Sequence, residues 1–209
     1  MLYFDTETTG IPDRKLPWSH ERQPRIVSIA WALDEPAPLG EEYEWHYLIK
    51  PNGWTIDESG KAFAAHHISQ TKCEAEGRPI HDVLAQFAEA VKDANEICAY
   101  NIDFDIDMTR IECEHTGIPW LNFPSRLDIL PLAQILCQIP PTEAMLAAGR
   151  RGFKPPKLAE ALKILCKEDF PDAHDVLADV RATIKIRRHI EEFRTCARSD
   201  QGVKNARPL

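Results

Sequence analysis

The sequence lacks the features of membrane, secreted and repeat proteins. It has no long apolar run, so we expect no transmembrane helix and no membrane partner. Its N-terminal segment has neither the basic stretch nor the apolar core of a signal peptide, which predicts a cytoplasmic location. Internal repeats and low-complexity tracts are also missing. A chain of 209 residues without these features is expected to form one compact globular domain, with two small domains as the alternative.

Cysteine pairs of the C-x-x-C type are absent too. The six cysteines stand apart, at Cys73, Cys98, Cys113, Cys137, Cys166 and Cys196. Their spacing suggests neither a zinc site nor a redox motif. Free thiols in a reducing compartment are the simplest interpretation.

An excess of positive charge is the third absence. The chain has 25 Lys and Arg against 33 Asp and Glu, which gives a formal net charge of −8. This balance excludes a protein whose whole surface is cationic and grips long duplex DNA. The net charge does not exclude a protein that holds a nucleic acid by local contacts near one end of the strand. A carboxylate-rich metal site would itself add negative charge, which bound cations would offset.

The first half of the chain alternates apolar segments with turn residues. Apolar stretches predict three strands, at residues 2–5, 26–33 and 43–49, separated by turns at 6–10 and 34–40 and by an exposed Pro-rich loop at 11–25. Helical spacing follows around 60–66 and at 79–95, then a strand at 96–101 and a helix at 103–115. The fourth strand has to return beside the first through a long helical crossover, because parallel pairing requires one.

The second half reads as one more strand followed by helices. The segment beginning at Arg126 predicts a fifth strand that continues into a helix ended by Pro140. Residues 139–156 are rich in Pro, Gly and basic residues and predict a mobile connection. Two helices are expected at 158–165 and 176–193. This order of elements indicates an α/β fold: a mixed five-stranded sheet, with a three-strand antiparallel meander plus parallel strands, flanked by helices.

Two acids at the end of the first strand form the first candidate motif, in FDTETTG. Residues two apart in a strand point to the same face, so Asp5 and Glu7 would project together. Two adjacent negative charges repel each other, which raises the free energy of the ionised pair. A bound divalent cation would offset this repulsion. The alternative is a pair of solvated acids at a polar strand end.

The second candidate is Asp105 in YNIDFD, where a strand gives way to a helix. Ligand sites of open α/β sheets lie at the carboxyl ends of strands. Asp103 is a candidate helix N-cap, and Asp107 is a further acid that competes for a metal role. The motif alone leaves the choice among these acids open.

The third candidate is HDVLADV, in which His174 precedes Asp179 by five residues. If Asp179 is on the last helix, His174 lies at or before its first turn. Histidine has an ordinary pKa of about 6.5, which suits general-base chemistry near neutral pH. The alternative is a loop histidine beside a helix, with Asp175 as an acid favoured by the helix dipole.

Together, and in this order, the three segments resemble the DEDD superfamily of exonucleases, in particular its DnaQ-like (DEDDh) branch. The likeness rests on FDTETTG, on YNIDFD, which fits N-x-x-F-D, and on HDVLADVRAT, which fits H-x-x-x-x-D. Secondary matches are IDESGKAFAAHHISQT, RLDILPLA and LAEALKIL. The resemblance covers residues 1–190, and the loop at 11–25 is its less typical part.

The resemblance implies both the fold and the roles of the site residues. The fold would be ribonuclease-H-like, with residues 1–195 as a single DEDDh exonuclease domain and 196–209 as a flexible C-terminal tail. Two divalent ions, Mg²⁺ or Mn²⁺, would be held by four carboxylates, which are Asp5, Glu7, Asp105 and Asp179. His174 would be the general base, and histidine here, where a sister branch has tyrosine, assigns the branch.

The implied activity is metal-dependent 3′–5′ exonuclease cleavage of single-stranded DNA or RNA, which releases nucleoside 5′-monophosphates. Two alternatives are a proofreading subunit that acts with a polymerase and a catalytically idle nucleic-acid-binding relative. The presence of all five key residue types argues against the idle relative. The expected partner is the 3′ end of a nucleic acid; a polymerase or a homodimer partner stays open.

Contacts to the substrate are also inferred from the resemblance. They are assigned to the backbone amides around Thr8 and Thr9, to Asn101 and to Phe104, although core packing is an alternative role for Phe104. Two basic segments, at 150–157 and 185–189, would hold phosphates of the strand or would simply be solvated.

Overall fold

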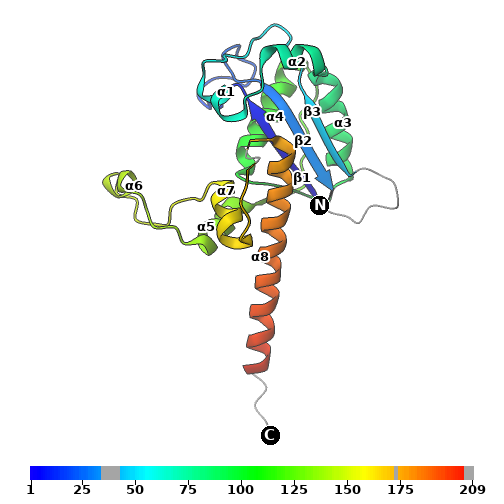
Figure 1. Ribbon diagram of the computed structural model, residues 1–209. Helices are drawn as coiled ribbons and strands as arrows, with labels where there is room; N and C mark the ends of the chain where they lie inside the picture. Colours follow the sequence, from blue (N-terminus) through cyan, green and yellow to red (C-terminus); the bar gives the residue numbers. More distant parts are fainter. Residues whose placement is uncertain (34–42, 172–173, 205–209) are drawn as a thin grey trace. The chain divides into compact units, whose positions relative to one another are not determined.

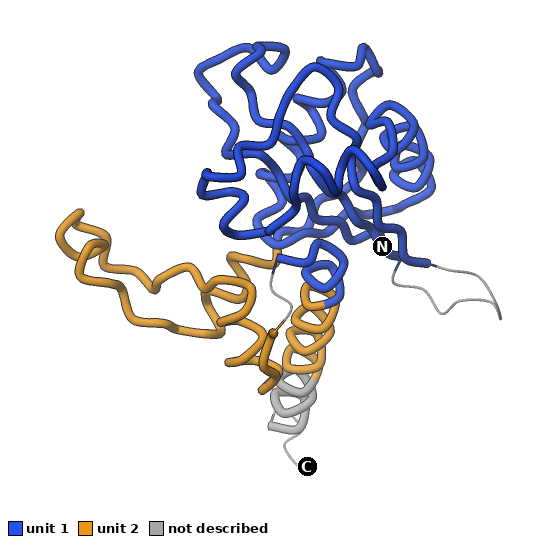
Figure 2. The backbone as a smooth tube through the Cα atoms, turned by 45° about the horizontal axis from the view of Figure 1, so that its top comes forward, with its two compact units in different colours: residues 1–128, 172–181 blue, residues 129–171, 182–209 orange. Residues whose placement is uncertain are grey.

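The computed structural model describes residues 1–33, 43–171 and 174–204. The turn expected at 34–40 lies outside these described residues. Within the described ranges, none of the helices is long and apolar enough to cross a membrane. The chain forms two compact units, shown in two colours in Figure 2: unit 1 is Met1–Asp128 with Asp172–Arg181, and unit 2 is Ile129–Pro171 with Ala182–Leu209.

Unit 1 is built on a five-stranded sheet with the order β3-β2-β1-β4-β5 (Figure 1). β1 (Leu2–Thr8) pairs antiparallel with β2 (Ile26–Leu33), which pairs antiparallel with β3 (Glu44–Leu48). β4 (Glu96–Ala99) runs parallel to β1 on its other side, and β5 (Ser125–Asp128) runs parallel to β4. The sheet confirms the expected meander and the parallel strands, and it places β1 at the centre.

Helices connect β3 to β4 and β4 to β5. The first connection contains α1 (Lys61–His66), α2 (Gln70–Glu76) and α3 (Ile80–Asp93), and the second contains α4 (Ile102–Thr116). The crossover of β4 back to β1 therefore has the form that parallel pairing demands.

The hydrophobic core lies between one face of the sheet and helices α3 and α4. Alternate residues of β1, Leu2 and Phe4, face this core and are almost completely buried. Helical spacing places a buried stripe on α3, and the rings of Phe4 and Trp31 lie 5.2 Å from the ring of Phe87, measured between centroids. The opposite face of the sheet carries Asp5, and the first turns of α8 lie across it (Figure 1).

A buried ion pair joins the start of β2 to α4. The side chain of Glu112 is fully buried and accepts hydrogen bonds from Arg25 Nε at 3.0 Å and from Arg25 Nη2 at 2.7 Å. The same carboxylate accepts the backbone N–H of Ile26 at 2.9 Å. Because Thr9 also exchanges hydrogen bonds with Arg25, this network fixes the two strand ends next to the acidic end of β1.

Unit 2 contains the remaining helices. α5 (Ile129–Cys137) packs against α7 (Leu158–Ala161) and the π-helical segment η1 (Leu162–Cys166). A short helix, α6 (Glu143–Ala147), is capped by the Thr142 hydroxyl, which accepts the N–H of Met145. The last helix, α8 (Val176–Lys204), begins in unit 1 and continues in unit 2.

Several local expectations were wrong in their bounds. β1 continues to Thr8, where a turn was expected from residue 6, because its pairing with β2 extends across the polar residues. α2 was not anticipated; the Ser69 hydroxyl caps it by accepting the N–H of Lys72. Residues 143–147 of the expected mobile connection form α6.

The structure also extends the last helix. α8 passes the expected end at residue 193 and continues to Lys204, into the predicted tail. The assignment of residues 1–195 to a single domain, with a flexible tail at 196–209, stays a prediction. The free thiols are confirmed for the cysteines whose side chains are described, which are Cys73, Cys98, Cys113, Cys137 and Cys166.

We predict that Glu112→Ala strongly destabilises the protein. The substitution leaves the Arg25 guanidinium, which is only 14% exposed, without its carboxylate, and loss of one partner of a buried pair costs about 3–5 kcal/mol. The measurement is the urea midpoint of unfolding, followed by circular dichroism. Asp169→Ala removes a partner from the exposed Lys163–Asp169 pair and serves as the control, with no change in midpoint. Equal midpoints for both variants would contradict the assignment.

Candidate metal-binding active site

The first two acids project from the carboxyl end of β1, the central strand. Asp5 and Glu7 point to the same face, and both are half-buried. The strand register places Glu7 opposite Ser28 of β2. The extended β1 thus confirms that the pair shares one face, which a turn at Thr6 would have prevented.

Asp105 approaches the same strand from the first turn of α4. Its side chain is 2% exposed, and its Oδ1 accepts a hydrogen bond from the Thr6 hydroxyl at 2.7 Å. Asp107 instead pairs with Arg14, whose Nε lies 2.7 Å from Asp107 Oδ2. The structure therefore places Asp105 beside β1 and Asp107 in a pair with Arg14, and the metal role of Asp105 stays a prediction.

Asp103 is not the N-cap of α4. The cap position is Asn101, which has a left-handed backbone with φ of 68° and makes no side-chain capping hydrogen bond. Asp103 lies inside the first helical turn. A cap at Asp103 was therefore a wrong expectation, because the helix begins one residue earlier, at Ile102.

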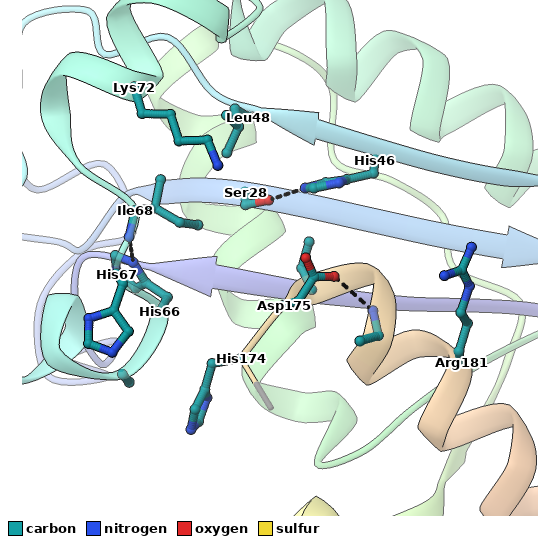
Figure 3. A pocket seen from close by; sticks show the side chains of 13 residues that line it. Ser28, His46, Leu48, His66, His67, Ile68, Lys72, His174, Asp175 and Arg181 are labelled. Atoms are coloured by element: carbon teal, nitrogen blue, oxygen red, sulfur yellow. Dashed lines mark hydrogen bonds between the residues drawn. The ribbon is translucent and has the colours of Figure 1, made fainter. Parts of the chain in front are cut away.

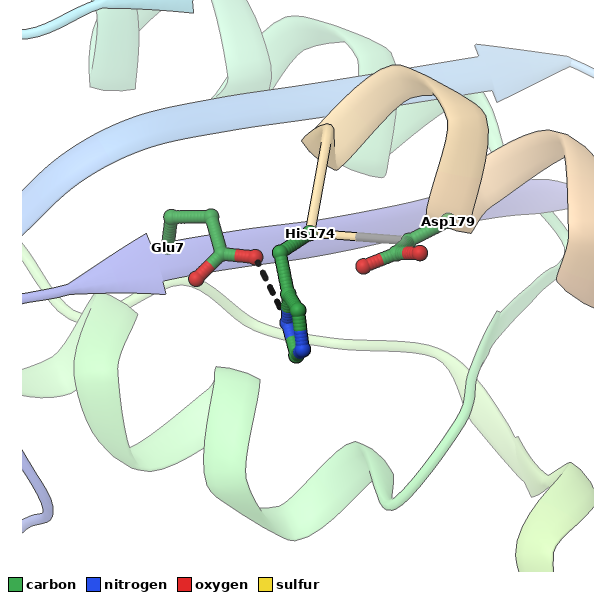
Figure 4. A group of neighbouring side chains, drawn as sticks. All are labelled: Glu7, His174 and Asp179. Atoms are coloured by element: carbon green, nitrogen blue, oxygen red, sulfur yellow. Dashed lines mark ion pairs between the residues drawn. The ribbon is translucent and has the colours of Figure 1, made fainter. Parts of the chain in front are cut away.

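The third motif brings an imidazole and a further carboxylate to Glu7. His174 Nδ1 lies 3.8 Å from Glu7 Oε1 (Figure 4). Asp179 comes from the first turns of α8 and is 8% exposed. One potential ligand atom from each of Glu7, His174 and Asp179 lies within 4.8 Å of the other two. Two segments distant in sequence, β1 and the start of α8, therefore converge on one point.

The chain enters α8 through a capped turn. Asp175 Oδ1 accepts the N–H groups of Leu177 at 3.1 Å and Ala178 at 3.0 Å, so Asp175 serves as the helix cap. His174, immediately before it, has a left-handed backbone with φ of 73°. Its imidazole is 55% exposed and points toward Glu7 (Figure 4). The cap fixes where the helix starts, and the left-handed residue directs the ring toward the acids.

Burial, and with it the charges of neighbouring acids, disfavours ionisation of the four carboxylates. Burial, followed by the charges of the other acids, raises the pKa of Asp5 well above its ordinary value. Burial and the neighbouring acids raise the pKa of Glu7 to about 8. Burial also raises the pKa of Asp105 to about 7, although hydrogen bonds from Thr6 oppose this, and that of Asp179 to about 7. Such a set is poised to exchange protons for a cation.

The donor set fits a hard divalent ion. Carboxylate oxygens are the ligands that Mg²⁺ and Mn²⁺ prefer, and the acids supply negative charge that burial leaves unsatisfied. Asp5, Glu7, Asp105 and Asp179 could hold such ions, with His174 at the exposed side. The charge on the ions would offset the repulsion that now raises the pKa values of the acids.

The expected substrate-contact residues surround this cluster. The Thr8 hydroxyl donates to Gly10 O at 2.7 Å, and the Thr9 N–H donates to Arg25 O at 2.9 Å, so the Thr9 amide is already engaged within the protein. Asn101 is exposed, and its N–H donates to Asp128 Oδ1 at 2.9 Å. Phe104 is half-buried against the core. Substrate roles for these residues stay predictions.

A cavity beside His174 contains residues that the sequence did not single out. It has a volume of about 420 Å³ and is lined by His46, Lys72 and Arg181, among others (Figure 3). His46 Nε2 lies 3.0 Å from the Ser28 hydroxyl. The one signal in the sequence was a serine inside the apolar strand IVSIAWAL; the register that places it opposite Glu7 required the sheet.

Two further acids shape the electrostatics from outside the motifs. Asp128, at the end of β5, helps to raise the pKa of Asp105, and Asp175 helps to raise those of Glu7 and Asp179. Asp128 is the last residue of β5, next to the helix α5, and the sequence offered no signal for its role beyond that expected strand end.

Three cations of the two basic segments are paired with acids within unit 2. Lys154 pairs with Glu160, and Lys185 pairs with Glu168. Arg187 pairs with Glu191 one helical turn further along α8. These cations are therefore less available to phosphates than the sequence suggested, while Arg150 and Arg151 are exposed.

Comparison with known proteins agrees with this arrangement. A model of the RNase T family, described as "Exonuclease", matches residues 2–187. This chain belongs to that exonuclease family. The match includes all the residues that converge here, and it confirms the DnaQ-like resemblance. No curated protein matches the chain at the threshold used.

Solved structures of exonuclease I share the fold. Exonuclease I from Methylocaldum szegediense superposes with a TM-score of 0.64 at 22% identity, over 91% of this chain and 40% of that one. E. coli exonuclease I in complex with a dT13 oligonucleotide gives a TM-score of 0.66 at 21% identity, over 96% and 42%. A zinc-bound E. coli exonuclease I–ssDNA complex gives 0.64 at 22% identity, over 91% and 40%. The chain thus spans about two fifths of these relatives.

We predict that the metal-free exonuclease-family chain loses stability as the pH rises. The folded acids keep protons up to about pH 7–8, whereas unfolded carboxylates lose them near pH 4, so the folded state binds more protons between these limits. Stability should therefore fall from about pH 5 to pH 8. The melting temperature in EDTA measures this effect. Glu7→Gln should flatten the slope; the same slope in both proteins would refute the linkage.

Proposed function

We propose that this chain is a metal-dependent 3′–5′ exonuclease that removes nucleoside 5′-monophosphates from single-stranded DNA or RNA. The observation that carries the proposal is the convergence of Glu7, His174 and Asp179 with ligand atoms within 4.8 Å, beside the half-buried Asp5 and the buried Asp105. Family membership supports the reaction class. Because the chain spans only part of exonuclease I, its own activity and substrate are proposals.

The positions of the side chains suggest a division of labour. When bound, two divalent ions would supply positive charge to the attacking water and to the departing 3′ oxygen. The four carboxylates would hold these ions and orient the phosphate. His174 turns Nδ1 toward Glu7, which leaves Nε2 to accept the proton of the water. The water oxygen forms a bond to phosphorus as the bond to the 3′ oxygen breaks, and that oxygen takes up a proton.

Several properties of the protein in its cell remain part of the proposal. Mg²⁺ and Mn²⁺ are the ions that a carboxylate-rich set favours. A cytoplasmic location and a polymerase or homodimer partner stay predictions.

A 5′-labelled oligonucleotide incubated with the purified chain and Mn²⁺ or Mg²⁺ should shorten from its 3′ end, and EDTA should stop this shortening. Matched DNA and RNA substrates would identify the sugar.

We predict that Asp105→Asn lowers metal-dependent mononucleotide release by more than about 10²-fold, since even outer-shell groups of metal sites contribute 10–100-fold. Asp103→Asn makes the same chemical change two residues away, on an exposed position of the same helical turn, and should retain full activity. The assay is initial-rate release from labelled oligonucleotide. An Asp105→Asn protein that is folded and as active as Asp103→Asn would exclude the carboxylate from the mechanism.

His174→Asn should lower the rate by about 10²–10⁴-fold, the usual contribution of a general base. Asparagine tolerates the left-handed backbone at this position, so the fold should persist. Calorimetric titration with Mn²⁺ should show that metal binding is retained. Full activity in this variant would remove His174 from proton transfer, whereas lost Mn²⁺ binding would make the residue a ligand.

A further inference from the structure

A series of aromatic–aromatic and arginine–aromatic contacts joins five residues of unit 1. The guanidinium of Arg110 lies over two indole rings, 5.4 Å from the centroid of Trp18 and 5.3 Å from that of Trp120. Trp120 meets Phe123 edge to face at 5.4 Å, and the guanidinium of Arg126 lies 5.9 Å from Phe123. We call these residues the aromatic–arginine row: Trp18, Arg110, Trp120, Phe123 and Arg126.

Both arginines of the row keep their hydrogen-bond donors free. Among the described residues, neither Arg110 nor Arg126 makes a hydrogen bond or an ion pair with a carboxylate, and both are exposed. Other cations of the chain contrast with them, since Lys154, Lys185 and Arg181 are each paired with an acid. In a protein with a net charge of −8, stacked arginines without a carboxylate partner point to an anionic ligand.

The stacking holds the arginines in place. Phe123 also stacks on the buried ring of Phe4 at 6.2 Å, and Trp18 packs against the same core. The guanidinium of Arg110 rests against two indole rings and is exposed, so its N–H edge can form bidentate hydrogen bonds to a phosphate. Trp120 is 40% exposed and offers a ring surface on which a base can stack.

The segments that carry the row also lead to the acidic cluster. Arg110 is on the same helix as Asp105, five residues further on, which is about 7.5 Å along a helix axis. Arg126 is two residues before Asp128, at the end of β5. Trp18 belongs to the loop that follows β1, which the Arg14–Asp107 pair fastens to α4. The row and the acidic cluster therefore share α4, β5 and the loop after β1, so a strand that extends from the cluster along these elements could contact both.

We infer that the aromatic–arginine row binds single-stranded nucleic acid upstream of the 3′-terminal nucleotide, with Arg110 and Arg126 on phosphates and Trp120 against a base. This inference rests on the proposed exonuclease function and adds a location for the rest of the strand. A single strand fits because its bases are free to stack, whereas those of a duplex are not.

The test measures binding without catalysis. Fluorescence anisotropy in EDTA, with 5′-labelled oligo(dT) and oligo(U) of two and twelve residues, gives dissociation constants for wild type, Arg110→Ala and Arg126→Ala. Lys92→Ala removes one exposed positive charge from α3 and is the matched control. Arg110→Ala should weaken the 12-mer about 10-fold and the dinucleotide much less. It should also reduce the salt dependence, log K against log salt, by about 0.7 for each lost phosphate contact.

Each outcome separates the row from the active site. Unchanged 12-mer affinity in both arginine variants, or an equal loss in Lys92→Ala, would overturn the inference, and so would a wild-type chain that binds neither 12-mer. An equally large loss with a 12-base-pair duplex would overturn the assignment to single strands. If Arg110→Ala does not fold, the affinity of Arg126→Ala for the 12-mers tests the inference, because the Arg126 side chain contacts one ring only and its removal should leave the fold intact. A chain that binds through the row but releases no mononucleotide with Mn²⁺ would refute the proposed function alone.

Discussion

Electrostatic repulsion among four carboxylates is the constraint that the rest of unit 1 must oppose. Burial raises the pKa values of Asp5, Glu7, Asp105 and Asp179, and the charges of neighbouring acids add to this increase. A site of this kind would spread apart if its backbone could yield. It cannot, because β1 is paired on both sides and the Thr6 hydroxyl holds Asp105 against it. The buried Glu112–Arg25 pair fastens the adjacent strand end to the helix that carries Asp105. Bound cations would neutralise the charges of these acids and so lower the free energy of the folded protein.

Sequence alone predicted the elements that depend on local pattern. The five strands, α3 and α4 follow from apolar periodicity and turn residues, and the order of the motifs identified the family before any geometry was known. Asp5 and Glu7 were placed on one face by the period of a strand. Local signals failed where contacts between distant segments decide the outcome. β1 continues through its polar residues because β2 pairs with it. The positions of Asp105 and Asp107 differ because Thr6 binds the first and Arg14 pairs with the second.

The surroundings of the acids were beyond reach of the sequence for the same reason. His46 and Ser28 meet across two strands, and their position beside His174 depends on strand register and on the start of α8. The sequence alone did not show that Lys154 and Lys185 of the basic segments pair with Glu160 and Glu168, which reduces their availability to phosphates. The aromatic–arginine row joins residues from the loop after β1, from α4 and from the chain leading into β5. No spacing rule connects these three segments.

The left-handed backbone at His174 means that the residue type best for stability at this position differs from the residue type needed for the proposed chemistry. Most side chains are strained at a φ of 73°, and glycine or asparagine would occupy it at lower cost. The imidazole is also largely exposed, so it adds little to the core. Thermodynamics therefore offers no reason for a histidine between the loop and α8. A variant with glycine or asparagine at position 174 should be at least as stable as the original protein. Stability measurements therefore do not distinguish family members that keep this histidine from those that have replaced it.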